Sequence, residues 1–594
     1  MLEKLVPQCT GIDVTARHGS IIMVAEVVHA LDEIETKTGQ LSLLSKNSRL
    51  REVFRVVKVL KDGNMFRGVS GEHMRAACSH LIARLSQCSS NLSIPRPTND
   101  SWTALIHDTL SHLHHFNNSE EICQLAISAL SAMNDVTLAA APFVTIAASP
   151  EKTDASLIDQ SIQQYLGCLR SETESTRSGY AQAIGSLPKP VIQGRLMVIL
   201  EGLFRATQIT NPSETSFAYA RRDAINALTR VCLTVGVAEK ANSGLCADNV
   251  DAIFAEIFRG LDDYTRDSRG DVGSHVRGAA VAALHDIASL VAHDKAELLS
   301  GRLVEAVMKK LLRQACEKLH NIRQAAVESF VSLLYHEKMP AIPHVDALLA
   351  IFPRGSKHFN LTELFKRLTQ TLELEKYAYE ALFGLMISVG DLTQSLAEAS
   401  GQALLSYMNS IREDEQKVKG VLANLTLILR SHSKNKRVSI PFLKTINQLL
   451  VNDCFEALNT AENVDIHAEL IAQIKTEILR TKDAHKVLLS VPVFCNMLFL
   501  TEPSLRSKVL SQLMVFLCHR FPIVRKTAAT QLYEQLMMYS ELIEAPEQLE
   551  VVLAYLVEVE WDQEEVTALR PKRNEMCGFF GVPVPQVKKK VDNK

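Results

Sequence analysis

Residues 262–277 of this 594-residue chain bring acidic and basic side chains together at high density. Carboxylates alternate with arginines, and Gly270 and Gly273 permit backbone angles that other residues avoid. Solvation alone would be served by any mixture of charges. We therefore expect a shaped polar surface, which either packs against the next structural unit or binds a partner. Adjacent carboxylates such as Asp262 and Asp263 rarely converge on one substrate, so the loop does not predict catalysis.

An amphipathic helix follows this loop and would position it. Val276, Ala280, Leu284, Ile287 and Val291 are spaced by 4, 4, 3 and 4 residues, which places them on one helix face. Most of the other expected second helices also begin with an apolar residue, an arginine and small residues, near positions 74, 221, 322 and 524. Small residues let neighbouring helices approach closely, and the arginine can reach acidic groups of the adjacent repeat.

The spacing of these helix starts predicts a repeat architecture. Arg222, Arg277 and Arg323 lie 55 and 46 residues apart, whereas HEAT and armadillo helix pairs repeat at about 40–47 residues. Glycine and proline number only 25 and 19, which favours helices nearly throughout. We predict an all-α fold, an α-solenoid of HEAT/armadillo-like helical repeats. A helical bundle without repeats is the alternative.

Composition limits the possible partners. The net charge is −3 and the isoelectric point about 6.7, which argues against a nucleic-acid-binding protein. An acidic partner would have to be met by local basic patches. The longest apolar stretch, residues 487–500, is 14 residues long, and a membrane-spanning helix needs about 20. We therefore expect no stable membrane insertion and a cytoplasmic location.

Motifs for catalysis or metal binding are missing from the sequence. The twelve cysteines form no CxxC pair, and the chain has no GxxxxGK[ST], GxGxxG or GxSxG motif. A cluster of four histidines (His107, His112, His114 and His115) suits a solvated helix face better than a metal site. We expect no cofactor, no metal and no enzymatic activity of the chain itself.

Three further polar segments are expected at turns between helices, at residues 7–19, 437–444 and 519–526. Such turns line up along one edge of a solenoid, so each segment serves either packing between repeats or partner binding. The candidate residues for these two roles are Arg17, His18, Arg221, Arg222, Asp262, Asp263, Tyr264, Arg266, Asp267, Arg269, Asp271, His519, Arg520, Arg525 and Lys526.

Taken together and in order, these segments resemble the C-terminal half of tubulin-folding cofactor D, also called tubulin-specific chaperone D. The matching residues are Cys9-Thr10-Gly11 with Ala16-Arg17-His18-Gly19, Phe217-Ala218 with Arg221-Arg222-Asp223, Asp262-Asp263-Tyr264-Thr265 with Asp267-Ser268-Arg269-Gly270-Asp271-Val272-Gly273, Ile342-Pro343-His344-Val345, Arg437-Val438-Ser439 with Pro441 and Leu443-Lys444-Thr445, and Cys518-His519-Arg520-Phe521-Pro522 with Arg525-Lys526-Thr527.

The resemblance implies a function in tubulin assembly. Members of this family bind β-tubulin after its release from the chaperonin and join cofactors E and C with α-tubulin. They contribute there to stimulation of GTP hydrolysis by tubulin, and they also bind an Arf-like small GTPase. Arg266 or Arg269 would be the candidate to reach a partner's nucleotide, as arginine fingers do. The alternative function is that of a generic HEAT-repeat scaffold or transport adaptor. Within the cytoplasm, association with the cytoskeleton is a second location that we consider.

The resemblance also suggests a division of the chain. Residues 1–95 would continue a solenoid that starts in an absent N-terminal half, and residues 96–355 would form central HEAT-like repeats. Residues 356–580 would form C-terminal helical repeats, followed by a basic flexible tail at residues 581–594. A first repeat without its predecessor would expose an apolar face.

Overall fold

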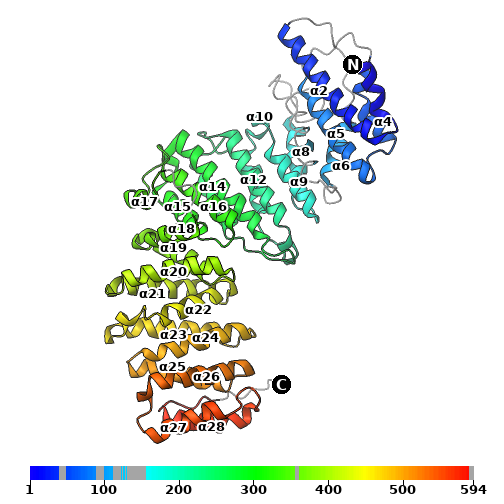
Figure 1. The fold of residues 1–594 in the computed structure, drawn as a ribbon. Coiled ribbons are helices and arrows are strands. Elements are labelled where there is room, and N and C mark those ends of the chain that lie inside the picture. The colour runs from blue at the N-terminus through cyan, green and yellow to red at the C-terminus, as the bar shows by residue number, and fades with distance from the viewer. Residues whose placement is uncertain are drawn as a thin grey trace. The chain divides into compact units, whose positions relative to one another are not determined.

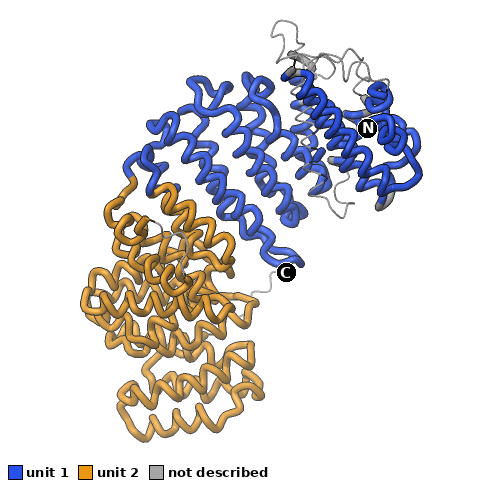
Figure 2. The backbone as a smooth tube through the Cα atoms, turned by 45° about the horizontal axis from the view of Figure 1, so that its top comes forward, with its two compact units in different colours: residues 1–307, 335–341 blue, residues 308–334, 342–594 orange. Residues whose placement is uncertain are grey.

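The computed structural model describes residues 1–38, 49–88, 100–111, 155–354 and 360–586, together with positions 122, 125, 126 and 129. Its described residues form α-helices and short 3₁₀-helices, and the only β pairing among them consists of two isolated bridges. The predicted all-α class is confirmed. The chain divides into two compact units, one of residues 1–307 and 335–341 and the other of residues 308–334 and 342–594 (Figure 2).

In the first unit, α12 packs between α9 and α14, with α13 packed against α14 (Figure 1). Among the N-terminal helices α2 packs against α5, and α6 contacts both α5 and α9. The helices of this unit are α1 (Leu2–Leu5), α2 (Val14–Thr38), α3 (Leu50–Val53), α4 (Val56–Asp62), α5 (Gly68–Gln87), α6 (Asp100–Ser111), α8 (Ala155–Cys168), α9 (Glu174–Gly185), α10 (Lys189–Ile192), α11 (Leu196–Ala206), α12 (Ala218–Val235), α13 (Val250–Leu261) and α14 (Gly273–Lys295).

In the second unit, successive helices stack in two rows (Figure 1). One row contains α19, α22, α24 and α26, and the other contains α21, α23 and α25. The helices are α16 (His320–Leu334), α17 (Val345–Ile351), α18 (Leu361–Gln370), α19 (Glu375–Val389), α20 (Gln394–Ser410), α21 (Glu415–Ser431), α22 (Lys436–Val451), α23 (Val464–Ile478), α24 (Ala484–Asn496), α25 (Pro503–Leu517), α26 (Pro522–Met538), α27 (Pro546–Glu558) and α28 (Val566–Phe579). Helix α15 (Gly301–Gln314) contains the boundary between the units.

Close helix approach depends on small residues, as the sequence indicates. At Gly384 in α19, a Cβ atom would lie 2.6 Å from Cys316 Cβ and 2.8 Å from the Arg313 carbonyl oxygen. Any larger residue would therefore force the neighbouring chain to move. Beside this contact, the Ser388 hydroxyl donates to the Cys316 carbonyl and fixes α19 against the turn that precedes α16.

Arginines at the starts of second helices are buried: Arg221, Arg277, Arg323 and Arg525 are all at most 6% exposed. Their partners differ in part from the acidic groups that we expected. Arg323 donates to the carbonyl oxygens of Glu317 and Lys318, at 2.6 and 3.0 Å. The backbone of the preceding turn has carbonyls that no helix hydrogen bond satisfies, and a guanidinium offers five donors in one plane.

The boundary between the two compact units falls near residue 307. The division at residues 95, 355 and 580 stays a prediction. Among the described helices, none combines the length and the apolar character that crossing a membrane requires.

Candidate functional site

The charged loop of residues 262–272 connects α13 to α14 and has a defined backbone. Asp267 and Gly270 exchange two backbone hydrogen bonds of 3.0 and 3.1 Å, which close a tight turn. Gly270 has a φ of 108°, a left-handed conformation that favours glycine. The second glycine of the loop, Gly273, begins α14, and its amide donates to the Thr265 carbonyl at 3.0 Å. Gly270 therefore has the backbone role that the sequence predicts, whereas Gly273 is helical and is required because a Cβ atom there would lie 2.4 Å from the Asp263 carbonyl oxygen.

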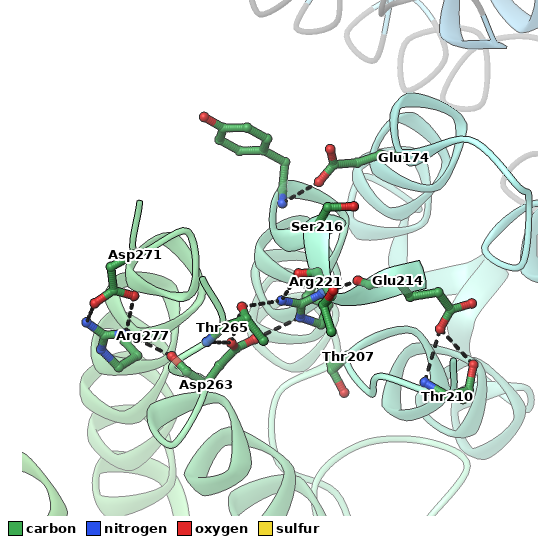
Figure 3. A network of polar contacts seen from close by, with 12 residues as sticks. Glu174, Thr207, Thr210, Glu214, Ser216, Arg221, Asp263, Thr265, Asp271 and Arg277 are labelled. Atoms are coloured by element: carbon green, nitrogen blue, oxygen red, sulfur yellow. Dashed lines mark hydrogen bonds and ion pairs between the residues drawn. The ribbon is translucent and has the colours of Figure 1, made fainter. Parts of the chain in front are cut away.

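Arg221 joins this loop to α12 (Figure 3). Its side chain is 3% exposed, and its Nε donates to Asp263 Oδ2 at 2.7 Å. Its two terminal nitrogens donate to the Glu214 carbonyl and to Thr265 Oγ1, both at 2.8 Å. Asp263 in turn accepts from the Thr265 amide and hydroxyl. One buried guanidinium thus holds the turns that precede α12 and α14 together.

Arg277, in the first turns of α14, is fully buried. Nη1 and Nη2 donate to the two carboxylate oxygens of Asp271 at 3.1 and 2.9 Å (Figure 3). Nη1 also donates to the Asp263 carbonyl at 2.8 Å, and the Tyr264 ring centroid lies 4.1 Å from the guanidinium carbon. Paired hydrogen bonds and a cation–π contact fit arginine and cannot be reproduced by lysine.

A more exposed layer of the same region surrounds Tyr219. The guanidinium groups of Arg222 and Arg269 lie 5.1 and 5.4 Å from the Tyr219 ring centroid. Arg269 also binds Asp267 at 2.6 Å and donates to the Ser216 carbonyl at 2.8 Å. This guanidinium holds the pKa of the Asp267 carboxyl below its usual value.

Arg266 and Asp262 have exposed positions on the loop. Arg266 makes no hydrogen bond or ion pair within the described part of the chain. The structure thus separates the loop candidates by burial. Arg221, Asp263 and Asp271 make contacts that hold the fold, whereas Arg222, Arg266 and Arg269 reach the surface.

The N-terminal candidates lie at the start of α2. Arg17 is 4% exposed and donates to the Ile12 carbonyl at 3.1 Å, with its other terminal nitrogen 2.6 Å from Met65 Sδ. The His18 ring meets the His73 ring edge-on, with the centroids 5.7 Å apart. Arg17 therefore joins α2 to the segment that follows α4.

The C-terminal candidates surround the turn between α25 and α26. Arg525 is 4% exposed and donates to the carbonyls of His519 and Trp561, at 3.0 and 2.5 Å. Arg520 is exposed, stacks on Phe521 and donates to the Thr481 carbonyl at 2.5 Å. Lys526 forms an exposed ion pair with Asp562 at 2.9 Å. Again one arginine holds successive turns together and its neighbours remain at the surface.

His519 should make stability depend on pH. Its Nδ1 accepts the Phe521 amide at 3.2 Å, and burial, followed by Arg520 and Arg525, lowers its pKa to about 4. Because the unfolded pKa is about 6.5, the unfolded state binds more protons between those values. This stability is therefore complete above about pH 6.5 and is lost as pH falls towards 4. Urea unfolding at pH 7.5 and pH 5 should show a smaller loss for His519→Asn, whose amide oxygen retains an acceptor, than for the natural chain. Equal losses would contradict this assignment.

Sequence reasoning missed a buried ion pair beside these turns. Lys486 Nζ lies 3.0 Å from Glu477 Oε2, and the two side chains are 3% and 2% exposed. Glu477 Oε1 also accepts from the Ser433 hydroxyl and the Lys434 amide, at 2.9 and 2.6 Å. The sequence did contain one signal of this pair. Asp483 caps a helix, and Lys486 interrupts the apolar run that follows it.

The described residues contain no cluster of three or more histidine, cysteine or acidic side chains that could hold a metal ion. Of the histidine cluster, His112, His114 and His115 lie outside the described residues. Burial raises the pKa of the Cys232 thiol to about 12, so this cysteine is protonated at neutral pH.

Comparison with known proteins tests the resemblance to tubulin-folding cofactor D. Residues 305–486 match the family model described as Tubulin folding cofactor D C terminal. The match covers less than a third of this chain. Tubulin-specific chaperone D of Dictyostelium discoideum is 24% identical over 345 residues, which are 52% of this chain and 23% of that protein. Tubulin-folding cofactor D of Schizosaccharomyces pombe is 24% identical over 217 residues, which are 35% of this chain and 19% of that protein. The resemblance to cofactor D is confirmed.

The matched segment extends from α15 to α24 and therefore lies mostly in the second unit. The chain spans about a quarter or less of the length of these cofactor D relatives. Among solved structures, that of Kap95p with RanGDP is similar over 97% of this chain and 69% of the other chain, with 10% identity and a TM-score of 0.40.

Proposed function

We propose that this chain is a tubulin-folding cofactor that binds β-tubulin after chaperonin release and helps to assemble the α/β-tubulin heterodimer. The observation that carries the proposal is the cofactor D match over residues 305–486. That segment is a stack of helix pairs whose turns carry exposed cations, and such a stack offers a large surface to a large partner. The chain would act by binding, without performing chemistry itself.

The proposal includes the other partners that the family resemblance implies. With cofactors E and C, the chain would contribute to stimulation of GTP hydrolysis by tubulin, and an Arf-like small GTPase would be a further partner. Arg269 is already engaged by Asp267 and by the Ser216 carbonyl. Arg266 is exposed, so it is the better placed of the two arginines to reach a partner's nucleotide.

Size-exclusion chromatography with purified tubulin tests this function. We expect the chain to co-elute with β-tubulin, with and without cofactors C and E. The reason is that the proposed activity is binding alone, which requires no chemical step by the chain. A helical, folded chain that elutes separately from tubulin under all these conditions would contradict the proposal. Addition of the N-terminal half of a cofactor D relative is the control, since co-elution only then would place the tubulin surface outside this chain.

A further inference from the structure

The second unit has a row of exposed cations at one set of turns. We name this row the basic ridge: Lys434 and Lys436 at the start of α22, Arg480 and Lys482 before α24, and Arg520 and Lys526 at the start of α26. All six side chains belong to exposed residues. The helices α22, α24 and α26 are neighbours in one row of the stack (Figure 1).

Contacts between the turns fix their order along the ridge. Lys436 binds Asp483 at 2.9 Å, which joins the start of α22 to the turn before α24. Arg520 donates to the Thr481 carbonyl at 2.5 Å, which joins the turn before α26 to the same central turn. Arg480 and Lys482 flank Thr481 in the sequence and therefore lie between Lys436 and Arg520.

The carboxylates of the ridge lie deeper than the cations. The Lys436 and Lys526 side chains are 69% and 61% exposed, whereas their partners Asp483 and Asp562 are 15% and 24% exposed. Glu477, beneath the central turn, is 2% exposed. A partner that approaches the ridge therefore meets ammonium and guanidinium groups before it meets carboxylates.

The central turn contributes two cations whose charges are not neutralised. Within the described residues, the side chains of Arg480 and Lys482 make no hydrogen bond or ion pair. Arg480 has a φ of 56°, and this left-handed position turns the chain from α23 towards α24. Two apolar side chains next to ridge residues in the sequence are also exposed, Leu479 at 65% and Ile523 at 51%.

We propose that the basic ridge binds an extended acidic polypeptide segment that carries apolar residues between its carboxylates. The carboxylates would pair with Arg480, Lys482 and the outer cations, and the apolar residues would cover Leu479 and Ile523. Neighbouring helices pack at roughly 10 Å, so three turns span about 20 Å, the length of about six residues of extended chain.

A polypeptide fits these features better than a nucleic acid does. Affinity for a phosphate backbone grows with the number of phosphates that cations neutralise, but Asp483 and Asp562 already pair with two of the six ridge cations. Exposed leucine and isoleucine side chains match apolar residues of a peptide.

The test uses the full chain and a fluorescent peptide of about ten residues built from glutamate and leucine in a Glu-Glu-Leu repeat. Fluorescence anisotropy should show binding that weakens as salt rises, because the ridge cations are exposed. The variant Arg480→Glu/Lys482→Glu should lose about tenfold or more in affinity. The matched control is Lys419→Glu/Lys508→Glu, which makes the same change in charge on α21 and α25, outside the ridge, and should bind as the natural chain does.

Circular dichroism should show equal helix content in all three proteins, and the neutral variant Arg480→Gln/Lys482→Gln provides a second measurement if charge reversal disturbs folding. The proposal fails if the ridge and control variants bind equally, or if the natural chain does not bind the peptide. It also fails if a single-stranded oligonucleotide of equal charge binds more tightly than the peptide. The proposal does not rest on the proposed function, since the probe contains no tubulin, and each can fail without the other.

Discussion

Replacing Glu477 with alanine should lower the free energy of unfolding of the second unit by about 3–5 kcal/mol. The change would leave the Lys486 ammonium, which is 3% exposed, without its carboxylate. It would also remove the acceptor of the Ser433 hydroxyl and the Lys434 amide. Native-state hydrogen exchange is the suitable measurement, because amides of α22, α23 and α24 report the stability of that part of the chain directly.

A double variant provides the control for this prediction. In Glu477→Leu/Lys486→Met both charges are absent, so no buried charge is left unpaired and most of the lost stability should return. The remaining loss would reflect the Ser433 and Lys434 hydrogen bonds. If Glu477→Ala lowers the unfolding free energy obtained from hydrogen exchange by less than about 1 kcal/mol, the pair does not hold these turns together.

Arg277→Ala should have the second large effect, a loss of about 3–4 kcal/mol of unfolding free energy in the first unit. The guanidinium is fully buried and binds both Asp271 oxygens, the Asp263 carbonyl and the Tyr264 ring. Arg277→Lys should recover only part of the loss, because an ammonium cannot make the paired contact and the stacking together. Hydrogen exchange of the α13 and α14 amides measures the loss of unfolding free energy in both variants.

Arg266→Ala is the matched control on the same loop. Arg266 is exposed, so its removal should change stability by less than about 0.5 kcal/mol. Equal destabilisation by Arg266→Ala and Arg277→Ala would show that burial does not separate packing residues from surface residues in this loop. The comparison therefore tests whether burial distinguishes candidate residues that hold the fold from those available to a partner.

The sequence was sufficient for the fold because its signals are local. The spacing of Val276, Ala280 and Leu284 defines a helix face within three turns. The spacing of helix starts assigns the arginine of α12 to Arg222, whereas Arg221 is the buried residue. An arginine nevertheless recurs at the start of most expected second helices, so the presence of a buried guanidinium there could be predicted. Its partners could not, since Arg221 and Asp263 are separated by 42 residues and meet only when helices stack. Backbone carbonyls that accept from Arg323 and Arg525 carry no sequence signal at all.

The candidate surface was less predictable than the fold. Arginines that hold turns and arginines that reach solvent are alike in sequence, and Arg221 and Arg222 differ only in the helix face that they occupy. The Glu477–Lys486 pair was missed because buried charges are rare and are found only when their partners are known. Arg480 and Lys482 look like ordinary turn residues until contacts between neighbouring turns place them on the basic ridge.

A hydrogen-exchange footprint of this chain with purified tubulin tests the account most directly. Binding through exposed turn cations predicts slower exchange at residues 432–437, 479–483 and 518–526 when tubulin is present, and a much weaker effect in Arg480→Glu/Lys482→Glu. Protection confined to other parts of the chain, or no protection at tubulin concentrations that saturate cofactor D relatives, would contradict it.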